Sequence, residues 1–485
     1  MKKTVFLTGA TGNMGWTGFQ ELLKKRDRFR VRILARRSAK NEKLLKPYLH
    51  DEDVEIVWGD LTVYDDVLAG VTGADFVLHV GGMVSPKADY YPEQTRKVNV
   101  TAAENIVRAV LAQPDHSSVK VVYIGSVAQC GDRMPPVHWG CAGDPVYASA
   151  YDMYAVSKCE AEKLIADSGL EHWVSLRQTG ILYPGIFTQI NPVMFHVPIR
   201  GVLEWATIED SGRLLANVCE DWVPEEFWNR FYNISSGEQY RMDNYEFMSR
   251  MLKPIGIRSI ENIFEPQWFA TRNFHGMWYT DADRLDEYLH FRANVPVDEY
   301  FSRIAARLPW FYSLARFVPA ALIKLFMRPI AYAKGLGTQS WATSDPDKLE
   351  AYYGSEQEYR DIRSWEQLRP VPLEKNLDKA RQSGEVVTLS HGYDVTKSIY
   401  SLDAEEIAEA AAFRGGKFLG PAESVGLKGA LFEWECEHGH RFSASLEYVL
   451  LGGGWCPECG ARNVRKTVTA RNRFTSQVLS AQCQE

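Results

Sequence analysis

The chain has 485 residues, which is long enough for two or three domains, and 45% of them are hydrophobic. Its formal net charge of −7 and its pI near 6.0 argue against a general nucleic-acid-binding protein. An apolar run begins directly after Met1-Lys2-Lys3, so we expect no signal peptide. Most of the cysteines show no spacing typical of a disulfide framework, which favours a reducing cytoplasm; these are Cys130, Cys141, Cys159, Cys219 and Cys483.

The first predicted element is a β-branched, apolar strand over residues 3–8, which leads into the glycine-rich run TGATGNMG (Thr8–Gly15). After it, Phe19, Leu22 and Leu23 fall at helical intervals. Strand, glycine turn and helix in this order can hold a dinucleotide pyrophosphate, because glycines permit a tight turn and close backbone approach. The helix N-terminus then presents its amides and the positive end of its dipole to the phosphates. An ordinary glycine-rich turn is the alternative.

The second predicted strand, over residues 30–35, ends in Arg36-Arg37-Ser38. In a dinucleotide-binding fold this strand end faces the adenosine ribose, where an acidic residue binds the 2′-hydroxyl and an arginine accommodates a 2′-phosphate. Two arginines and no acidic residue are present, which favours NADP(H) over NAD(H) because a guanidinium suits phosphate geometry. A solvated basic turn is the alternative.

Further apolar strands are expected at residues 54–58, 75–80 and 119–124, with helices such as 99–111 between them. Alternating strands and helices predict an α/β fold. We expect a Rossmann-type, doubly wound parallel sheet that is covered on both faces and binds its ligand at the carboxyl ends of the strands.

The motif YAVSK (Tyr154–Lys158) places a phenol and an ammonium at i and i+4, on one face of a predicted helix. A tyrosine normally titrates near pH 10, and a nearby ammonium would lower that pKa. Lys158 can also bind the nicotinamide ribose. Ser126, 28 residues before Tyr154 and at the end of a predicted strand, can hold the substrate oxygen. Tyr154 and Lys158 alone could form a solvated helix face, but behind a nucleotide-binding turn they indicate acid–base catalysis of hydride transfer.

Together these motifs resemble the extended short-chain dehydrogenases/reductases, of the NAD(P)-dependent epimerase/dehydratase and 3β-hydroxysteroid dehydrogenase type. The resemblance covers about residues 1–300, and its motifs follow the order of the family. Besides the glycine turn and YAVSK, the matching landmarks are GDL (Gly59–Leu61), HVGG (His79–Gly82), NVTAAEN (Asn99–Asn105), IGSVAQCG (Ile124–Gly131), LRQTGILYPG (Leu176–Gly185), TIEDSGRLL (Thr207–Leu215) and YNISSGE (Tyr232–Glu238).

The resemblance implies that Ser126, Tyr154 and Lys158 are catalytic. With the turn and strand-end residues above, the expected cofactor-binding set is Gly9, Thr11, Gly12, Asn13, Met14, Gly15, Arg36, Arg37, Asp60, Leu61, Val80, Tyr154 and Lys158. The sequence departs from the family's sugar-nucleotide dehydratases, which carry an adjacent acidic pair where this chain has Val127, Ala128 and Gln129. We therefore do not expect a dehydratase.

The segment between Gly185 and Ile208 is short and largely apolar. Relatives that bind nucleotide sugars usually have a longer and more polar segment here, because a second pyrophosphate must be held; Arg200 and Arg213 are the few cations nearby. Either this segment lines a pocket for a hydrophobic ketone or alcohol, or it forms the core of a smaller lobe. Its apolar residues are Ile186, Phe187, Ile190, Val193, Met194, Phe195, Val197, Ile199, Val202, Leu203 and Trp205.

We divide the rest of the chain into a helical extension at 301–375, a polar linker at 376–400 and a module at 401–485, which opens with a capping-box pattern around Asp403. In the extension, Arg316, Lys324 and Arg328 interrupt the apolar stretch 310–336 before it reaches a membrane-spanning length. We expect this stretch to pack on the catalytic lobe or on another subunit. An interfacial helix on a membrane is the alternative.

The C-terminal module contains Cys436-x₃-His440 and, fifteen residues later, Cys456-x₂-Cys459. These four ligands suit a tetrahedral Zn²⁺, and a closed site of this kind is structural because no position is left open for catalysis. Residues 405–461 resemble a small treble-clef-like zinc ribbon with the pattern W-x-C-x-x-G-H-x-F. His438 is the rival ligand to His440, and a redox CxxC pair is the alternative to zinc.

Zinc ribbons often bind nucleic acid or protein. Because the chain is acidic, with few basic residues beside the ribbon, we expect no nucleic-acid partner and interpret the module as an interaction or dimerisation appendage. The basic residues in question are Arg462, Arg465, Lys466, Arg471 and Arg473.

The sequence thus predicts a cytoplasmic, NADP(H)-dependent oxidoreductase that interconverts a hydroxyl and a ketone or aldehyde on a hydrophobic small molecule of steroid, terpenoid or phenolic type. A nucleotide-sugar 4-epimerase with tightly held NAD is one alternative, and a dinucleotide-sensing regulatory protein that uses the zinc module is another. The resemblance also implies a homodimer formed through two helices per subunit, around residues 99–111 and 154–168.

Overall fold

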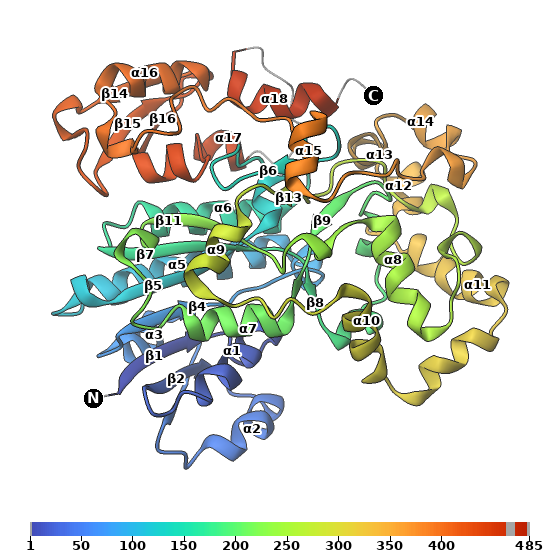
Figure 1. Cartoon of the computed structure of the whole chain (residues 1–485), viewed down its shortest axis with the longest axis horizontal. Coiled ribbons are helices and arrows are strands. Elements are labelled where there is room, and N and C mark those ends of the chain that lie inside the picture. The colour runs from blue at the N-terminus through green and yellow to red at the C-terminus, as the bar shows by residue number, and fades with distance from the viewer. Residues whose placement is uncertain (1, 462–470, 483–485) are drawn as a thin grey trace.

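The computed structural model describes residues 2–461 and 471–482. The strands of its central sheet are β1 (Lys3–Thr8), β2 (Phe29–Ala35), β3 (Val54–Trp58), β4 (Phe76–His79), β5 (Lys120–Ser126), β7 (His172–Gln178) and β11 (Arg230–Ile234). They are all parallel and lie in the order β11-β7-β5-β4-β1-β2-β3 (Figure 1). The Rossmann-type sheet expected from the sequence is confirmed.

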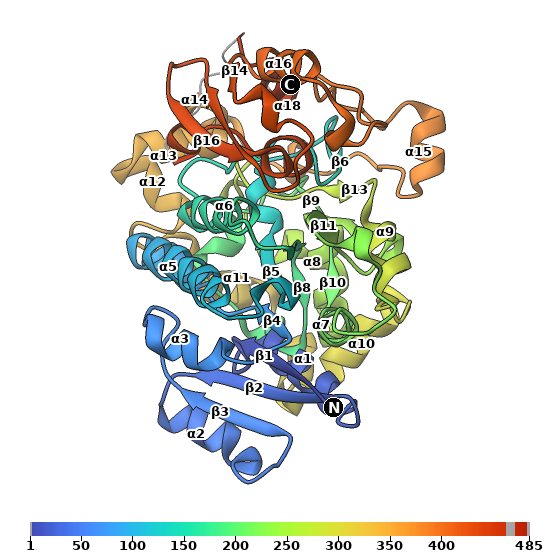
Figure 2. The same cartoon turned by 90° about the vertical axis from the view of Figure 1, so that its left-hand side faces the viewer.

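Helices cover both faces of this sheet (Figure 2). Those around it are α1 (Asn13–Leu23), α2 (Ala39–Leu45), α3 (Tyr64–Val71), α4 (Lys87–Tyr90), α5 (Pro92–Leu111), α6 (Met153–Ala166), α7 (Ile208–Asn217) and α9 (Ala282–Leu289). On one face α5 packs against α3 and α6, and on the other α1 packs against α7. The helix expected at 99–111 begins earlier, at Pro92, because proline is well accommodated in the first turn of a helix.

A smaller lobe lies beside the carboxyl ends of the strands, at the right of Figure 1. Its elements are β8 (Ile181–Leu182), β9 (Val202–Glu204), β10 (Ala206–Thr207), β12 (Arg241–Asp243), α8 (Asn244–Leu252) and α10 (Val297–Ala306). The helical extension packs on this lobe through residues such as Trp341 and Tyr353, which are buried in its core. The extension consists of the 3₁₀ segment η11 (Trp310–Phe317), α11 (Ala320–Ala331), α12 (Thr338–Ser344), α13 (Pro346–Tyr353) and α14 (Glu356–Asp361).

The segment predicted as a linker, 376–400, is held against the rest of the molecule. It contains α15 (Leu377–Ser383), whose Ala380 is buried beside Trp139 of β6 (Trp139–Gly140) and Trp278 of β13 (Trp278–Tyr279). Farther along, Nε2 of His391 lies 3.1 Å from a carboxylate oxygen of the buried Asp144. The linker therefore does not behave as a free tether.

The C-terminal module has the elements α16 (Ala404–Phe413), β14 (Lys417–Gly420), β15 (Leu431–Glu435), β16 (Arg441–Ser445), the π-helical segment η15 (Glu447–Leu451), α17 (Pro457–Ala461) and α18 (Arg473–Gln482). Its three strands form an antiparallel sheet in the order β14-β15-β16. The expected capping box is present, because Asp403 accepts from the amide of Glu406 and the Glu406 side chain accepts from the amide of Asp403.

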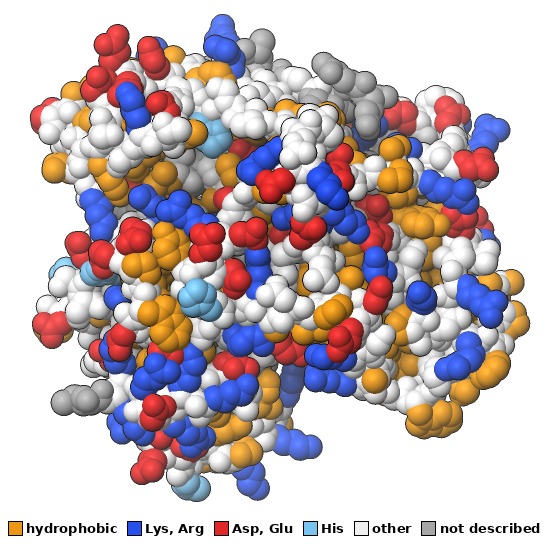
Figure 3. Space-filling view, viewed as in Figure 1, with side chains coloured by type: hydrophobic (Ala, Val, Ile, Leu, Met, Phe, Trp, Pro, Cys, Tyr) orange, Lys and Arg blue, Asp and Glu red, His pale blue; other side chains and the backbone are white. Residues whose placement is uncertain are grey.

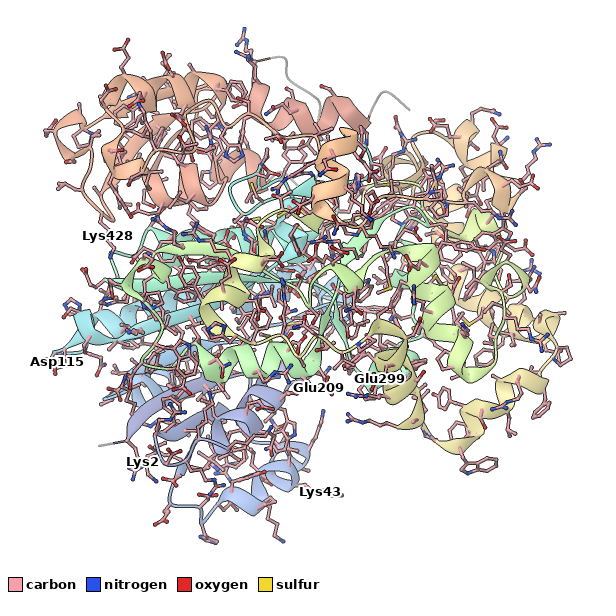
Figure 4. The ribbon with its side chains drawn as sticks, viewed as in Figure 1. Lys2, Lys43, Asp115, Glu209, Glu299 and Lys428 are labelled. Atoms are coloured by element: carbon pink, nitrogen blue, oxygen red, sulfur yellow. The ribbon has the colours of Figure 1, made fainter. Side chains whose placement is uncertain are left out.

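The module docks on α6. The ammonium of Lys163 donates to the carbonyl of Ser443 at 2.7 Å, and Asp167 accepts from the amide of Ser445 at 2.9 Å. Figure 4 shows Lys428 at the edge of the module that faces the sheet domain, where its ammonium lies 3.7 Å from Glu171. A single buried hydrophobic cluster continues from α5, α6 and β7 into the module. The module is thus part of the main core, whereas the sequence suggested an appendage.

One buried arginine joins the module to α6. The guanidinium of Arg177, on β7, donates to both carboxylate oxygens of Glu162 on α6, at 2.7 and 3.0 Å. The same guanidinium donates to the carbonyl of Gly452 in the module at 2.6 Å. Both charged side chains are almost fully buried, so each depends on the other for its charge to be compensated.

Candidate functional site

The glycine turn joins β1 to α1 through close backbone packing. Gly9 has a φ of +73°, and a Cβ there would lie 2.7 Å from the amide nitrogen of Gly81. A Cβ on Gly15 would lie 2.2 Å from the carbonyl oxygen of Gly9. Gly12 is the N-cap of α1 and provides no side-chain cap. The first amides of α1 therefore face the cavity described below with no side chain across them, as phosphate binding requires.

Thr8 fixes the turn to the end of β4. Its hydroxyl accepts from the amide of Gly81 at 2.9 Å and lies 3.0 Å from Nδ1 of His79. Burial, with a contribution from the charge of Lys158, lowers the pKa of His79 to about 3, so this imidazole is neutral. We did not single out Thr8 or His79 from the sequence, where each occurs only inside a longer motif.

A cavity of about 1340 Å³ runs from the glycine turn to the smaller lobe, along the carboxyl ends of the strands. All of the residues predicted for the cofactor and for catalysis line it: Gly9, Thr11, Gly12, Asn13, Met14, Gly15, Arg36, Arg37, Asp60, Leu61, Val80, Ser126, Tyr154 and Lys158. Residues from five different strand ends and from two helices are thus brought to one surface.

Cations form the rim of the cavity after β2. Arg36, Arg37 and Lys40 are exposed and line its edge. The Arg37 guanidinium lies over the ring of Trp58, 5.0 Å from the ring centroid, and 3.2 Å from Glu42. These contacts hold the guanidinium near the strand end, where the sequence placed a 2′-phosphate.

Ser126 and Tyr154 meet on the floor of the cavity. Ser126 ends β5, and its hydroxyl accepts from the amide of Ala128 at 3.2 Å. Gln129 accepts from the amide of Ser126 at 2.7 Å, which completes a capping box and fixes the orientation of the serine. The side chains of Ser126 and Tyr154 share a hydrogen bond. The two groups that would contact a substrate oxygen are therefore adjacent.

Lys158 lies one turn after Tyr154 on α6, and its ammonium donates to the carbonyl of Ile124 at 2.8 Å. Burial lowers the pKa of Lys158 to about 8, although the carboxylate of Glu162 acts in the opposite direction. We expected the ammonium to lower the pKa of Tyr154. That expectation is wrong for this structure, because burial raises the pKa of Tyr154 to about 12 and outweighs the hydrogen bond from Ser126.

Asn99 of α5 is a site residue that the sequence showed only as part of a family landmark. Its amide nitrogen donates to Ser157 of α6 at 3.0 Å and to the carbonyl of Met83 at 3.1 Å. Its amide oxygen accepts from the amide of Met83 at 2.8 Å. The side chain thus fixes the segment after β4 against the helix that carries Tyr154 and Lys158.

The apolar segment after Gly185 serves both of the purposes left open by the sequence. Some of its residues line the cavity, and these are Ile186, Val193, Met194, Val197, Val202, Leu203 and Trp205. Phe187, Phe195 and Ile199 are buried in the core of the smaller lobe instead, and Ile190 is exposed. Residues 183–205 and 242–251, all described by the structure, give the cavity no lysine or arginine. Arg200 and Arg213 bond elsewhere, to Gln367 and Asp210 among others.

In the module, Cys436, His440, Cys456 and Cys459 converge. Nδ1 of His440 lies 3.4, 3.6 and 3.3 Å from the three sulfurs, and two sulfurs are 3.8 Å apart. Metal–ligand bonds of about 2.0 to 2.3 Å in a tetrahedron require ligand separations of roughly 3.5 to 3.8 Å, so this donor set fits Zn²⁺. His438 is exposed and does not belong to the cluster. Arg462, Arg465 and Lys466 lie outside the described residues, as does Cys483.

Comparison with known proteins agrees with this geometry. Residues 5–181 match the model of the NAD dependent epimerase/dehydratase family. A UDP-glucose 4-epimerase of Rickettsia bellii is 29% identical over 111 residues, which are 22% of this chain and 32% of that protein. The 3 beta-hydroxysteroid dehydrogenase type 7 of Rattus norvegicus is 25% identical over 217 residues, 43% of this chain and 57% of that protein. The chain thus spans about a third to just over half of these relatives.

Among solved structures, the dTDP-glucose 4,6-dehydratase of Bacillus anthracis in complex with NAD superposes with a TM-score of 0.50 at 12% identity. The superposition covers 64% of this chain and 96% of that one. At this identity the likeness concerns the fold alone.

Proposed function

We propose that the chain is an NADP(H)-dependent oxidoreductase, since residues 5–181 match the model of the NAD dependent epimerase/dehydratase family. It interconverts a hydroxyl and a ketone or aldehyde on a hydrophobic small molecule of steroid, terpenoid or phenolic type. The observation that carries the proposal is one continuous cavity, which has the glycine turn at one end, Ser126, Tyr154 and Lys158 on its floor, and apolar walls at the other end.

The roles of the three side chains follow from their positions. A nicotinamide cofactor, when bound, supplies or accepts the hydride. Ser126 donates a hydrogen bond to the substrate oxygen and holds it beside Tyr154. In the reducing direction Tyr154 gives its phenolic proton to that oxygen, and in the oxidising direction it takes the proton back. Lys158 would hold the ribose hydroxyls of the bound cofactor through its ammonium.

The proposed preference for NADP(H) is supported by the cations at the rim of the cavity after β2. The proposed structural metal is supported by the cysteine cluster of the module. Arg36 and Arg37 offer planar, charged donors that match a 2′-phosphate. We further propose that Cys436, His440, Cys456 and Cys459 hold a Zn²⁺ with no catalytic part.

A nucleotide-sugar 4-epimerase is the second candidate, favoured by the relatives of that name. Such an enzyme must bind a second pyrophosphate, and the absence of lysine and arginine from cavity residues 183–205 and 242–251 argues against it. An epimerase would also retain its cofactor through purification, whereas the proposed reductase exchanges it.

The deciding experiment is a titration of purified protein with NADPH and NADH. We expect tighter binding of NADPH, and a loss of about 30-fold for NADPH alone in an Arg36→Ala/Arg37→Ala variant, since each lost charged hydrogen bond costs about 1 kcal/mol at this exposed rim. Arg30→Ala/Lys43→Ala is the matched control, because these exposed cations belong to β2 and α2 but do not line the cavity. Equal affinities in wild type, or NAD⁺ that never leaves, would discard the NADP(H) assignment.

A further inference from the structure

Large apolar side chains are exposed together in one segment of the helical extension. Trp310 and Phe317 are each 77% exposed and Phe326 is 72% exposed. Figure 3 shows hydrophobic side chains gathered at the lower right edge of the molecule, where Figure 1 draws this segment in golden yellow. We call this surface the aromatic patch and define it by Trp310, Phe311, Phe317, Leu322, Leu325 and Phe326.

The patch is presented on a firmly anchored support. On the opposite side of α11, Met327 and Ala331 are buried in the core of the smaller lobe. The ammonium of Lys324 lies 2.9 Å from Glu265, which ties α11 to that lobe. Leu322, Leu325 and Phe326 therefore form the outer face of a packed helix.

The segment that carries the patch contains cations and no acidic residue of its own. No aspartate or glutamate occurs between Glu299 and Asp345, whereas this stretch carries six cations: Arg303, Arg307, Arg316, Lys324, Arg328 and Lys334. Arg316 and Arg328 are exposed, and each guanidinium lies over a neighbouring aromatic ring, at 5.9 and 5.3 Å from the centroids of Phe317 and Tyr332. Arg303, Arg307 and Lys324 are paired with Glu299, Glu209 and Glu265, whereas in the described part of the chain Arg316 and Arg328 form no ion pair. Aromatic side chains beside such unpaired cations are typical of segments that bind at a membrane interface.

We propose that the aromatic patch binds the surface of an anionic lipid bilayer and holds the protein there without crossing it. The 12 residues of α11 extend for only about 18 Å, far less than the roughly 30 Å of a bilayer core. In the described part of the chain, no helix is both long and apolar enough to span a membrane. The segment can thus lie in the interface, with its rings among the acyl chains and its cations at the phosphates.

A second copy of the chain fits the patch less well. In a two-fold symmetric dimer the same surface meets itself, which would bring Arg316 and Arg328 of one protomer close to those of the other. No acidic residue of the segment could compensate them. Anionic headgroups supply the missing countercharge, and for this reason we assign the patch to lipid.

The patch also lies next to the apolar end of the cavity. α11 packs against η5 (Pro192–Phe195), whose Val193 and Met194 line the cavity. If the proposed function is right, a hydrophobic substrate dissolved in the bilayer would be concentrated close to the cavity. Membrane binding itself does not depend on the proposed reaction, because it needs neither cofactor nor substrate.

The test is cosedimentation of the full-length protein with vesicles of phosphatidylcholine alone and of an equimolar mixture with phosphatidylglycerol. We expect binding to the mixed vesicles that weakens as salt is added. Trp310→Ser/Phe317→Ser/Phe326→Ser should lower the partition coefficient on the order of 100-fold or more. Arg316→Gln/Arg328→Gln should lower it about 25-fold on mixed vesicles only.

Val371→Ser/Val395→Ser/Leu427→Ser is the matched control, since these exposed apolar side chains lie outside the patch and their loss should leave partitioning unchanged. Because every substituted residue is exposed, folding should be preserved, and circular dichroism checks this. The proposal is overturned if wild-type protein stays in the supernatant, or if the patch variant sediments as wild type does. It is also overturned if the patch variant loses only a concentration-dependent dimer seen by sedimentation velocity, because the patch then binds a second copy.

Discussion

Gly9 and Gly169 share a left-handed backbone but not their surroundings, with φ values of +73° and +75°. A Cβ at Gly169 would meet nothing within 4 Å, whereas one at Gly9 would strike the backbone of Gly81. Gly169→Ala should therefore lower the free energy of unfolding by the backbone strain alone, about 1 to 2 kcal/mol. Gly9→Ala should cost roughly 3 kcal/mol or more and abolish cofactor binding, since backbone cannot move aside cheaply. Urea denaturation and cofactor titration measure both; equal losses in the two variants would contradict the close packing of the turn.

Tyr154 is the proposed proton donor, so its phenol should matter to turnover and not to cofactor affinity. We expect Tyr154→Phe to lower kcat by about 100- to 10,000-fold, the usual contribution of a positioned acid or base. NADPH titration of the same variant is the internal control and should match wild type. Turnover near that of wild type would remove Tyr154 from the mechanism.

The pH dependence of reduction should report Lys158. Its pKa is lowered to about 8, so the ammonium is present below that pH and is lost as the pH rises through it. The pKa of Tyr154, raised to about 12, leaves the phenol protonated over the same range. We therefore expect kcat/KM for reduction to be level at neutral pH and to fall about tenfold per pH unit above pH 8.

Glu162 should set the pH at which kcat/KM begins to fall on the alkaline side. Its carboxylate raises the pKa of Lys158, so Glu162→Gln should shift the alkaline limb to lower pH without removing it. The measurement is the kcat/KM profile of the variant against wild type, with urea denaturation to report any loss of stability from the pair with Arg177. A limb that does not move would show that another group titrates.

At the residue scale, the sequence predicted which residues form the candidate site better than it predicted their pKa values and contacts. Gly9, Ser126, Tyr154 and Lys158 stand in contiguous motifs, so local pattern was enough to select them. The direction of the pKa shift of Tyr154 was not accessible, because it depends on burial by residues distant in sequence. Asn99 was missed as a site residue for a similar reason, since its partners Met83 and Ser157 come from other elements.

Helix α6 shows how one element can serve two purposes. Tyr154, Lys158 and Glu162 recur every four residues on the face toward the sheet and the cavity, while Lys163 and Asp167 contact the module. The spacing of YAVSK predicted the first face. Nothing in the local pattern could predict the second, because lysine and aspartate at a helix end look the same whether solvent or another domain lies beside them.

The proposed zinc site makes its own prediction within the module. His440→Ala should lose bound zinc and up to about 10 kcal/mol of the stability of the module, because structural zinc binding is coupled to folding. His438→Ala is the matched control, since this histidine is exposed two residues away and outside the cluster. Zinc content by atomic absorption and thermal unfolding by circular dichroism are the readouts. Zinc loss in both variants, or in neither, would contradict the ligand set.

For the whole molecule, the sequence predicted the central sheet but not how the segment 376–400 and the C-terminal module pack against it. Strands β1 and β3 begin and end where the pattern placed them, because alternation with helices is a local signal. The segment 376–400 looked like a linker from its polar composition. Its attachment through Ala380 and His391 to residues far back in the chain has no local signature. The homodimer through the helices around 99–111 and 154–168 stays a prediction, and the module already contacts part of the second helix.

Shared packing predicts the outcome of removing the module. A chain that ends at residue 400 would uncover apolar residues of α6, β7 and β11 that now belong to one buried cluster with the module. We expect this truncation to aggregate, or to unfold at a markedly lower temperature than the full chain, in thermal denaturation followed by light scattering. A soluble truncation with the Tm of the full chain would instead support an appendage.

The guanidinium of Arg177 connects the two proposed sites, the catalytic residues on α6 and the cysteine cluster of the module. It neutralises Glu162, one turn beyond Lys158, and it also donates to the carbonyl of Gly452, four residues before Cys456. If the cluster holds zinc and the metal is lost, the chain around Cys456 should become less ordered. Arg177 would then lose its hydrogen bond to Gly452, and α6 would lose this contact with the module. A preparation with less than one zinc per chain should then contain active, zinc-bound molecules and inactive, zinc-free molecules. Turnover per mole of protein should therefore rise in proportion to the zinc content, while KM stays constant.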